Sequence, residues 1–192
     1  MNEASPVNSA SAKALRSGGD PPARDFAPES DDAIFDMMEL FFFAYRDFVK
    51  DADRLLEKYK FGRAHHRVLH FVDRRPGLAI AALLDILKIT KQSLNRVLKQ
   101  LLDGGFVEAR EGANDRRQRL LYTSPEGAAL ARELARLQSA RFVRVLSGLS
   151  PDARRSATEF LLAMIDQDDR ASVRAHLLVA ATARPVGEEP PP

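Results

Sequence analysis

The stretch from Thr90 to Lys99 carries the side chains best suited to contacting a nucleic acid. Its polar members are hydroxyls, amides and cations, and none of them is an acid. Leu94, Val97 and Leu98 alternate with these groups at helical spacing, which predicts an inward apolar face and an outward polar face. The candidate DNA-contacting residues on the outward face are Thr90, Lys91, Gln92, Ser93, Asn95, Arg96 and Lys99.

Each of these side-chain types has a defined partner on duplex DNA. The amides of Gln92 and Asn95 can pair bidentately with adenine, while Arg96 can read guanine or clamp a phosphate. Because a helix N-terminus also presents free backbone amides, the start of this helix is suited to the major groove. The alternative interpretation is a solvated helix face.

Two arginines occupy a second position where a cation can enter a groove. Residues 106–110 and 119–123 read as short strands around the polar stretch 112–115, which predicts a β-hairpin. Arg116 and Arg117 lie at its tip, where guanidinium groups can enter a narrow minor groove. This hairpin is the expected wing of the DNA-binding module.

A histidine pair is the third candidate for chemistry. His66 and His70 stand four residues apart, so both imidazoles lie on one helix face and could begin a metal site. Arg67 follows His66, so the glutamate of a zinc-protease HExxH helix is missing. No third ligand and no cysteine accompany the pair. We therefore expect histidines packed at a helix interface and no metal or other cofactor, with a metal-responsive regulator as the alternative.

The charge is divided unevenly along the chain of 192 residues. The net charge is only +2, but residues 61–124 contain 12 basic and 6 acidic side chains. An excess of positive charge confined to one segment is typical of a module that binds a polyanion. The absence of cysteine excludes disulfides, thiolate metal sites, nucleophilic cysteine and thiol-based redox sensing.

No part of the sequence predicts a membrane association. No uncharged apolar run approaches the roughly 20 residues that cross a bilayer. Residues 1–30 are rich in Pro, Ser and Gly and have no apolar core typical of a signal peptide, so we expect a disordered arm and a cytoplasmic protein.

Helical periodicity predicts the elements that position the candidate residues. A long helix runs from Asp31 to about Tyr59, and its apolar stripe is so wide at residues 41–43 that we expect it to pack against a second chain, or to form a wide internal core. We expect two short helices next, one after Gly62 and one over residues 78–87, and a third that begins at the cap Thr90. Two more helices should begin at Ser124-Pro125-Glu126 and at Ser150-Pro151-Asp152, and the end of the last one should fray from residues 166–169 onward. The helices joined at Lys88 and Ile89 form a helix-turn-helix.

The ordered motifs of this segment resemble the MarR family of winged helix-turn-helix transcriptional regulators. The resemblance rests on Pro76-Gly77-Leu78, on residues 89–97 and 101–107, on Asp115-Arg116-Arg117, and on Ser124-Pro125-Glu126-Gly127. Two positions depart from the family pattern, since Lys88 stands where a glycine is usual and Thr123-Ser124 where Leu-Thr is usual. A non-glycine residue at position 88 would have to tolerate a positive φ.

The resemblance implies a mainly α fold with a small β-hairpin wing and long N- and C-terminal dimerisation helices that build a triangular homodimer. The corresponding division is a disordered arm 1–30, a MarR-type domain 31–168 with the winged helix-turn-helix at about 62–124 and dimerisation helices at 31–60 and 125–168, and a tail 169–192 that is partly helical and then disordered. By the same resemblance, Asp115 pairs with an arginine of the wing, and a simple turn residue is the alternative.

The resemblance also implies a small-molecule effector, often aromatic or phenolic, that releases the DNA. The matching walls here would be the long first helix and the helix after Gly62, with the candidate residues Phe41, Tyr45, Arg46, His65, His66 and His70. For Phe41 and Tyr45 the alternative, a plain dimer core, is the more common role of such residues.

Together these observations predict a homodimeric, non-enzymatic transcription factor, by default a repressor, that binds duplex DNA. Two symmetric modules imply a pseudopalindromic operator with half-sites about one helical turn apart. One alternative is a winged-helix adaptor that binds protein instead of DNA. Another is an enzyme that uses the histidines, although no phosphate loop, nucleophile elbow or carboxylate pair supports it.

Overall fold

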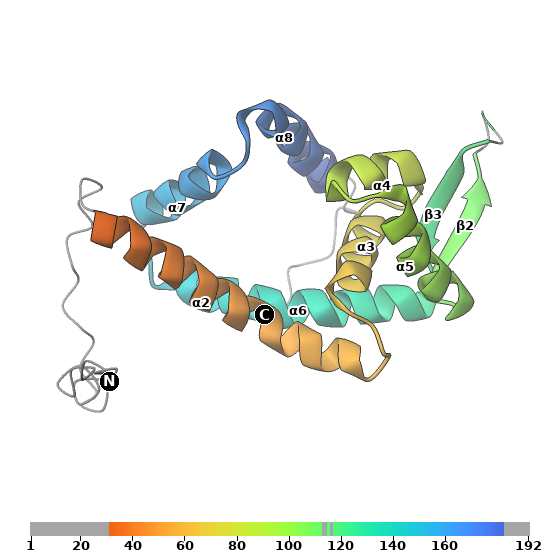
Figure 1. Cartoon of the computed structure of the whole chain (residues 1–192), viewed down its shortest axis with the longest axis horizontal. Coiled ribbons are helices and arrows are strands. Elements are labelled where there is room, and N and C mark those ends of the chain that lie inside the picture. The colour runs from red at the N-terminus through yellow and green to blue at the C-terminus, as the bar shows by residue number, and fades with distance from the viewer. Residues whose placement is uncertain (1–30, 113–114, 116, 183–192) are drawn as a thin grey trace, which may run out of the picture. The chain divides into compact units, whose positions relative to one another are not determined.

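The computed structural model describes residues 31–112, 115 and 117–182, and the chain divides after Phe43 into two units, Met1–Phe43 and Ala44–Pro192. Figure 1 shows the helices and strands with the labels used below. Their bounds are α2 Asp31–Glu57, α3 Arg63–Arg74, β1 Leu78–Ala79, α4 Ile80–Leu87, α5 Lys91–Asp103, β2 Val107–Glu111, β3 Arg119–Thr123, α6 Pro125–Ser147, α7 Pro151–Ala163 and α8 Gln167–Thr182. Within the described parts, no helix is both long and apolar enough to cross a bilayer.

One apolar core holds the winged module together. Its fully buried side chains come from nearly every element of that module: Leu56 of α2, Leu69 of α3, Leu83 of α4, Leu94 and Leu101 of α5, Leu121 of β3 and Leu134 of α6. Burying one such side chain contributes roughly 1.5–3 kcal/mol. The packing of α3 against both α5 and α6 places the helix-turn-helix on a rigid support.

Helix α5 begins and ends where the sequence predicts. The Thr90 side chain accepts a hydrogen bond from the Ser93 backbone amide at 3.2 Å, which satisfies one of the free amides of the first turn. At the other end, Gly105 has a φ of +75°, a conformation that glycine adopts without strain. The cap at Thr90 therefore fixes the residue at which the polar face of α5 starts.

The wing contains one strand more than the sequence predicts. The expected hairpin is present as β2 and β3, and β1 pairs with β3 to give an antiparallel sheet in the order β1-β3-β2. The prediction that Leu78 starts a helix is wrong, because its backbone pairs with Leu121 and the neighbouring Gly77 amide donates to the Leu121 carbonyl at 2.8 Å. The mainly α fold with a winged helix-turn-helix is confirmed.

The chain also continues in a helix where the sequence predicts fraying. The backbone amides of Asp169 and Arg170 donate to the Asp166 carbonyl, and α8 starts there with Asp168 and Asp169 in its first turn. Acids in a first turn are stabilised by the positive end of the helix dipole. The Arg170 guanidinium donates to the carbonyls of Ala163 and Ile165 at 2.8 Å each, which ties α8 to the end of α7.

Gly127 lies too close to the backbone of Phe106 to be replaced. A Cβ at position 127 would stand 1.8 Å from the Phe106 carbonyl oxygen, and that oxygen accepts from the Ser124 amide at the start of α6. We expect Gly127→Ala to lower the free energy of unfolding by at least about 2 kcal/mol, because backbone must move to admit a methyl group. Urea unfolding followed by circular dichroism measures this. Gly148→Ala, whose Cβ would meet an ordinary contact of 3.6 Å, is the control, and equal stability of the two variants would contradict the argument.

Candidate nucleic-acid interface

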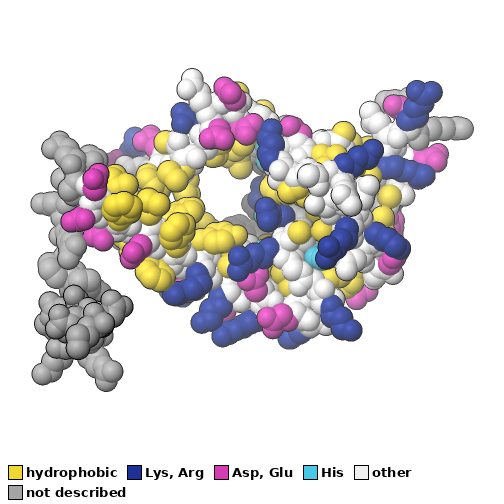
Figure 2. All heavy atoms as spheres, in the orientation of Figure 1, with side chains coloured by type: hydrophobic (Ala, Val, Ile, Leu, Met, Phe, Trp, Pro, Cys, Tyr) yellow, Lys and Arg dark blue, Asp and Glu magenta, His cyan; other side chains and the backbone are white. Residues whose placement is uncertain are grey.

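The outward face of α5 is polar, solvent-exposed and free of acids along its first two turns. Leu94, Val97 and Leu98 are buried beneath it. Figure 2 shows Lys and Arg side chains spread over the surface of this winged region. The exposed side chains of the face are Lys91, Gln92, Ser93, Asn95, Arg96 and Lys99.

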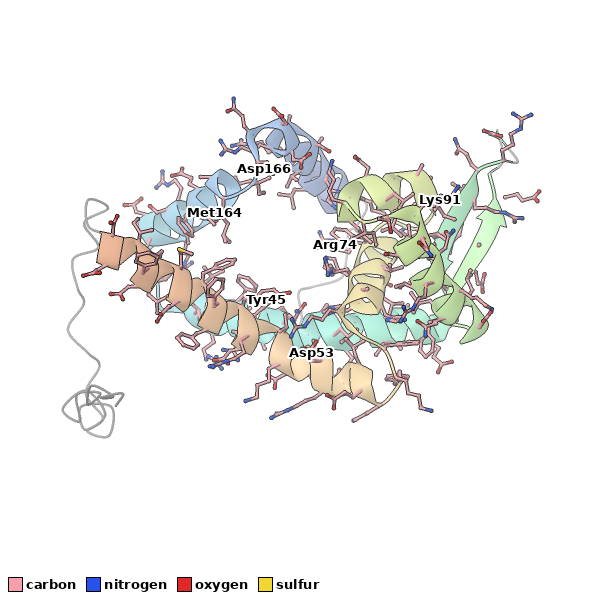
Figure 3. All side chains as sticks on the ribbon, in the orientation of Figure 1. Tyr45, Asp53, Arg74, Lys91, Met164 and Asp166 are labelled. Carbon is pink, nitrogen blue, oxygen red and sulfur yellow. The ribbon has the colours of Figure 1, made fainter. Side chains whose placement is uncertain are left out.

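The cations on this face differ in their freedom to meet a phosphate. Lys99 is paired with Asp103 one turn later, with a distance of 2.6 Å between Nζ and Oδ2. Lys91 and Arg96 have no ion partner within the described parts of the chain. Figure 3 shows Lys91 at the start of α5, pointing away from the core. Lys91 and Arg96 are therefore the cations of α5 that are available without breaking an internal ion pair.

Two of the predicted contact residues already bond to each other. The Thr90 hydroxyl donates to the Ser93 hydroxyl at 2.9 Å while it accepts from the Ser93 amide. Both residues are exposed, so the cap lies at the surface at the N-terminal end of the polar face. Its geometry directs the first amides of α5 outward, where an anion can approach them.

In the wing, Asp115 has the contact of a turn residue. Its Oδ1 accepts from the Arg117 backbone amide at 2.9 Å. The predicted pairing of Asp115 with an arginine side chain stays a prediction, because Arg116 lies outside the described residues, as do positions 113–114 of the turn. On strand β2 of the wing, Arg110 is held by Glu108 at 2.9 Å and lies over the Tyr122 ring at 4.4 Å from its centroid. Arg110 therefore stiffens the strands.

His65 is part of the scaffold. It is buried, and its ring stacks on Phe61 with centroids 4.6 Å apart. Its Nδ1 accepts from the Gly62 amide at 3.1 Å, and its Nε2 lies 2.7 Å from the Gln100 side-chain oxygen. These bonds require the proton on Nε2, which then donates to Gln100. His65 thus links the start of α3 to α5 and has no ring nitrogen left for a ligand.

The structure does not bring the six predicted effector residues into one pocket. Phe41 belongs to unit Met1–Phe43, Arg63 lies over the Tyr45 ring at 5.6 Å, and Arg46 pairs with Asp47 at 3.0 Å. Of the six, His70 lines a cleft of about 370 Å³ whose other walls come from α4 and α8. Within the described residues, no group of three or more His, Cys, Asp or Glu side chains could hold a metal ion.

His66 and His70 are partly buried on α3, and this burial changes their acidity. Desolvation by burial lowers the pKa of His66, and it lowers the pKa of His70 to about 4. The nearby charges of Arg74, His66 and His176 add to the effect at His70. Both imidazoles are therefore neutral at pH 7 and offer hydrogen-bonding groups without charge.

Lys88 is a residue near this surface that sequence reasoning did not select. It ends α4 in the left-handed conformation, with φ 50° and ψ 42°, and precedes the cap of α5 by two residues. The only signal in the sequence is the presence of a lysine at a position where glycine is usual. Its ion partners, described below, come from two different helices.

Comparison with known proteins supports the same kind of module. The model of the MarR family matches residues 59–118. The HTH-type transcriptional regulator PetP of Rhodobacter capsulatus is 44% identical over 137 residues, which are 71% of this chain and 82% of that protein. The fold is similar to that of Streptococcus pneumoniae FabT, whose crystal structure was solved in complex with DNA (TM-score 0.61, 15% identity, 68% of this chain and 94% of that chain). It is also similar to that of a SlyA-like transcription regulator from Listeria monocytogenes (TM-score 0.58, 19% identity, 71% and 93%).

The lowered pKa of His70 makes a prediction about stability at acid pH. As the pH falls below about 6.5, the unfolded chain takes up a proton that folded His70 refuses until about pH 4. The free energy of unfolding should therefore decrease over this window, and His70→Gln should make the decrease shallower. Urea unfolding at several pH values between 7 and 4 measures the slope, and an unchanged slope in the variant would show that His70 does not titrate in this way.

Proposed function

This chain belongs to the MarR family of transcriptional regulators, and from this premise we propose that it binds duplex DNA as a homodimer and represses transcription by occupying promoter DNA. The observation that carries the proposal is the outward face of α5, where Lys91 and Arg96 have no ion partner among the described residues and flank the amides of Gln92 and Asn95. Binding in a groove of DNA requires a face with free cations and no acids, whereas a protein-binding adaptor does not require one.

Recognition divides between α5 and the wing. The N-terminal half of α5 enters the major groove, where Gln92 and Asn95 reach base edges and Lys91 and Arg96 contact the backbone or guanine. Arg117, with Arg116, reaches the neighbouring minor groove. Thr90 and Ser93 set the end of α5 against a phosphate, and Lys99 contributes once it leaves Asp103.

A second copy of the chain is the partner that we assign to the exposed apolar faces. Aromatic and aliphatic side chains of unit Met1–Phe43 stand in solvent on α2, which Figure 2 shows as a concentration of apolar side chains. Helix α7 has no buried residue and exposes Phe160, Leu161 and Met164. Large contiguous apolar surfaces normally mark an interface. The exposed apolar residues of that part of α2 are Ile34, Phe35, Met37, Met38, Leu40, Phe41, Phe42 and Phe43.

We further propose that a small aromatic or phenolic molecule releases the DNA. The support is the pair His66 and His70 on one face of α3, partly buried and neutral at pH 7, whose ring nitrogens can exchange hydrogen bonds with a phenolic hydroxyl. Tyr45 and Arg46 are exposed on α2 and do not line the cleft that His70 lines, so the proposal rests on His66 and His70.

The DNA-binding proposal predicts the effect of reversing charge on the outward face. The triple variant Lys91→Glu, Arg96→Glu, Arg117→Glu should lose at least about 100-fold in affinity for duplexes selected from fragments of the source genome, because three phosphate contacts become repulsive. Fluorescence anisotropy at increasing salt should also show a shallower dependence of log affinity on log salt, by about 2–3 per protomer. The matched variant Lys58→Glu, Lys60→Glu, Arg132→Glu changes the net charge equally at exposed sites outside α5 and the wing. Equal losses in both variants would sink the proposal.

The dimer proposal predicts the mass in solution. Multi-angle light scattering should give twice the chain mass of 21.3 kDa. Replacing Phe41 and Phe42 with glutamate should shift the protein to the monomer, because an interface does not accommodate unpaired buried charge. A stable monomer of the unaltered chain would contradict the assignment of these faces.

A further inference from the structure

Helix α8 contacts the winged module through three separate interactions, two with α3 and the residue that follows it and one with the turn at Lys88. The Arg75 guanidinium donates to the His176 carbonyl at 2.7 Å, and the ring of Phe71 meets the ring of His176 edge-on with centroids 5.2 Å apart. At the other end, Asp169 pairs with Lys88 at 3.1 Å between Oδ1 and Nζ. Figure 1 shows α8 beside α4. The contacts bring the first turn of α8 to the turn that precedes α5.

The Lys88 ammonium is shared between two carboxylates. It lies 3.2 Å from Asp85 on its own helix and 3.1 Å from Asp169 on α8, and both acids raise the pKa of Lys88. The side chain is more than half exposed, at 59%. The ammonium is therefore charged, accessible to solvent and paired with two carboxylates at the turn that precedes α5.

The interface between α8 and the winged module is loosely packed. None of its described side chains is fully buried, and the cleft of about 370 Å³ remains between α8 and the module, lined in part by Phe71, Ile86, Val173 and Leu177. An exposed ion pair contributes only about 0–1 kcal/mol. The contact between Asp169 and Lys88 can therefore be exchanged for a competing anion at small cost.

We propose that Lys88 is a further contact to the DNA backbone and that α8 withholds it from DNA through Asp169. This inference rests on the proposed function. In a helix-turn-helix the first helix crosses the phosphate backbone while the second enters the groove, so the turn between them lies near phosphates. Beside Asp85 of its own helix, the ammonium at this turn has either Asp169 or a phosphate as its second partner. When α8 is docked, with Asp169 paired to Lys88, the affinity for DNA is lower. When α8 leaves this position, the affinity is restored.

The direction of the effect follows from charge. When α8 is docked, Asp169 neutralises one cation at the protein–DNA boundary and one fewer counterion is released on binding. Asp168 on the same helical turn has no partner within the described residues and carries the same charge without touching Lys88. Comparing substitutions of Asp169 and Asp168 therefore distinguishes the effect of the specific ion pair with Lys88 from a general effect of net charge.

The test compares Asp169→Asn with Asp168→Asn in the full-length chain. The probe is a labelled duplex of about 30 base pairs carrying a sequence selected from genomic fragments, long enough for two half-sites one turn apart. We expect Asp169→Asn to raise affinity about two- to fivefold, the equivalent of an exposed ion pair. The dependence of log affinity on log salt should steepen by about 0.9 per protomer. Asp168→Asn should change both quantities much less.

A double-mutant cycle assigns the effect to Lys88. In a Lys88→Gln background, which should itself bind more weakly once α8 is undocked, Asp169→Asn should no longer raise affinity. Equal effects of the two asparagine variants, a lower affinity of Asp169→Asn, or a gain that persists without Lys88 would each overturn the inference. If the unaltered chain bound no duplex at all, the proposed function would fail, and that result is distinct from these three.

Discussion

The burial of Leu94, Val97 and Leu98 is the constraint on which the rest of the molecule depends. These side chains fix the rotation of α5 about its own axis, because turning the helix would expose apolar surface that contributes several kcal/mol to the core. Thr90 fixes its start, and the bond between His65 and Gln100 ties it to α3. The position of the polar face of α5 is thus fixed by a buried apolar face, by the cap at Thr90 and by the bond to α3.

Acidic side chains then decide which cations on this surface are available. Asp103 holds Lys99, Glu108 holds Arg110, and Asp85 with Asp169 holds Lys88. Lys91 and Arg96 are left for a partner of opposite charge. A simple count of basic residues therefore overstates the positive charge that the module presents, and the arrangement of ion pairs is more informative than the net charge.

Local signals in the sequence predicted most of the fold. Helical periodicity and capping residues located α5 and α6, because a cap such as Thr90 or Ser124 acts within its own turn. Strand β1 could not be predicted in this way, since a pair of residues has no periodicity and its pairing with Leu121 is decided by the tertiary fold. The polar face of α5 was read from spacing alone. The ion partners of Lys88 and Lys99 could not be predicted from spacing, because an ion pair depends on which side chains the folded chain brings together.

The backbone of Lys88 has a cost that its side chain explains. An L-residue in the left-handed region gives up roughly 1 kcal/mol that a glycine would not. Glycine, however, has no side chain with which to meet Asp85 and Asp169. At this position the chain gives up local conformational energy and gains an ammonium that pairs with carboxylates of two helices, α4 and α8.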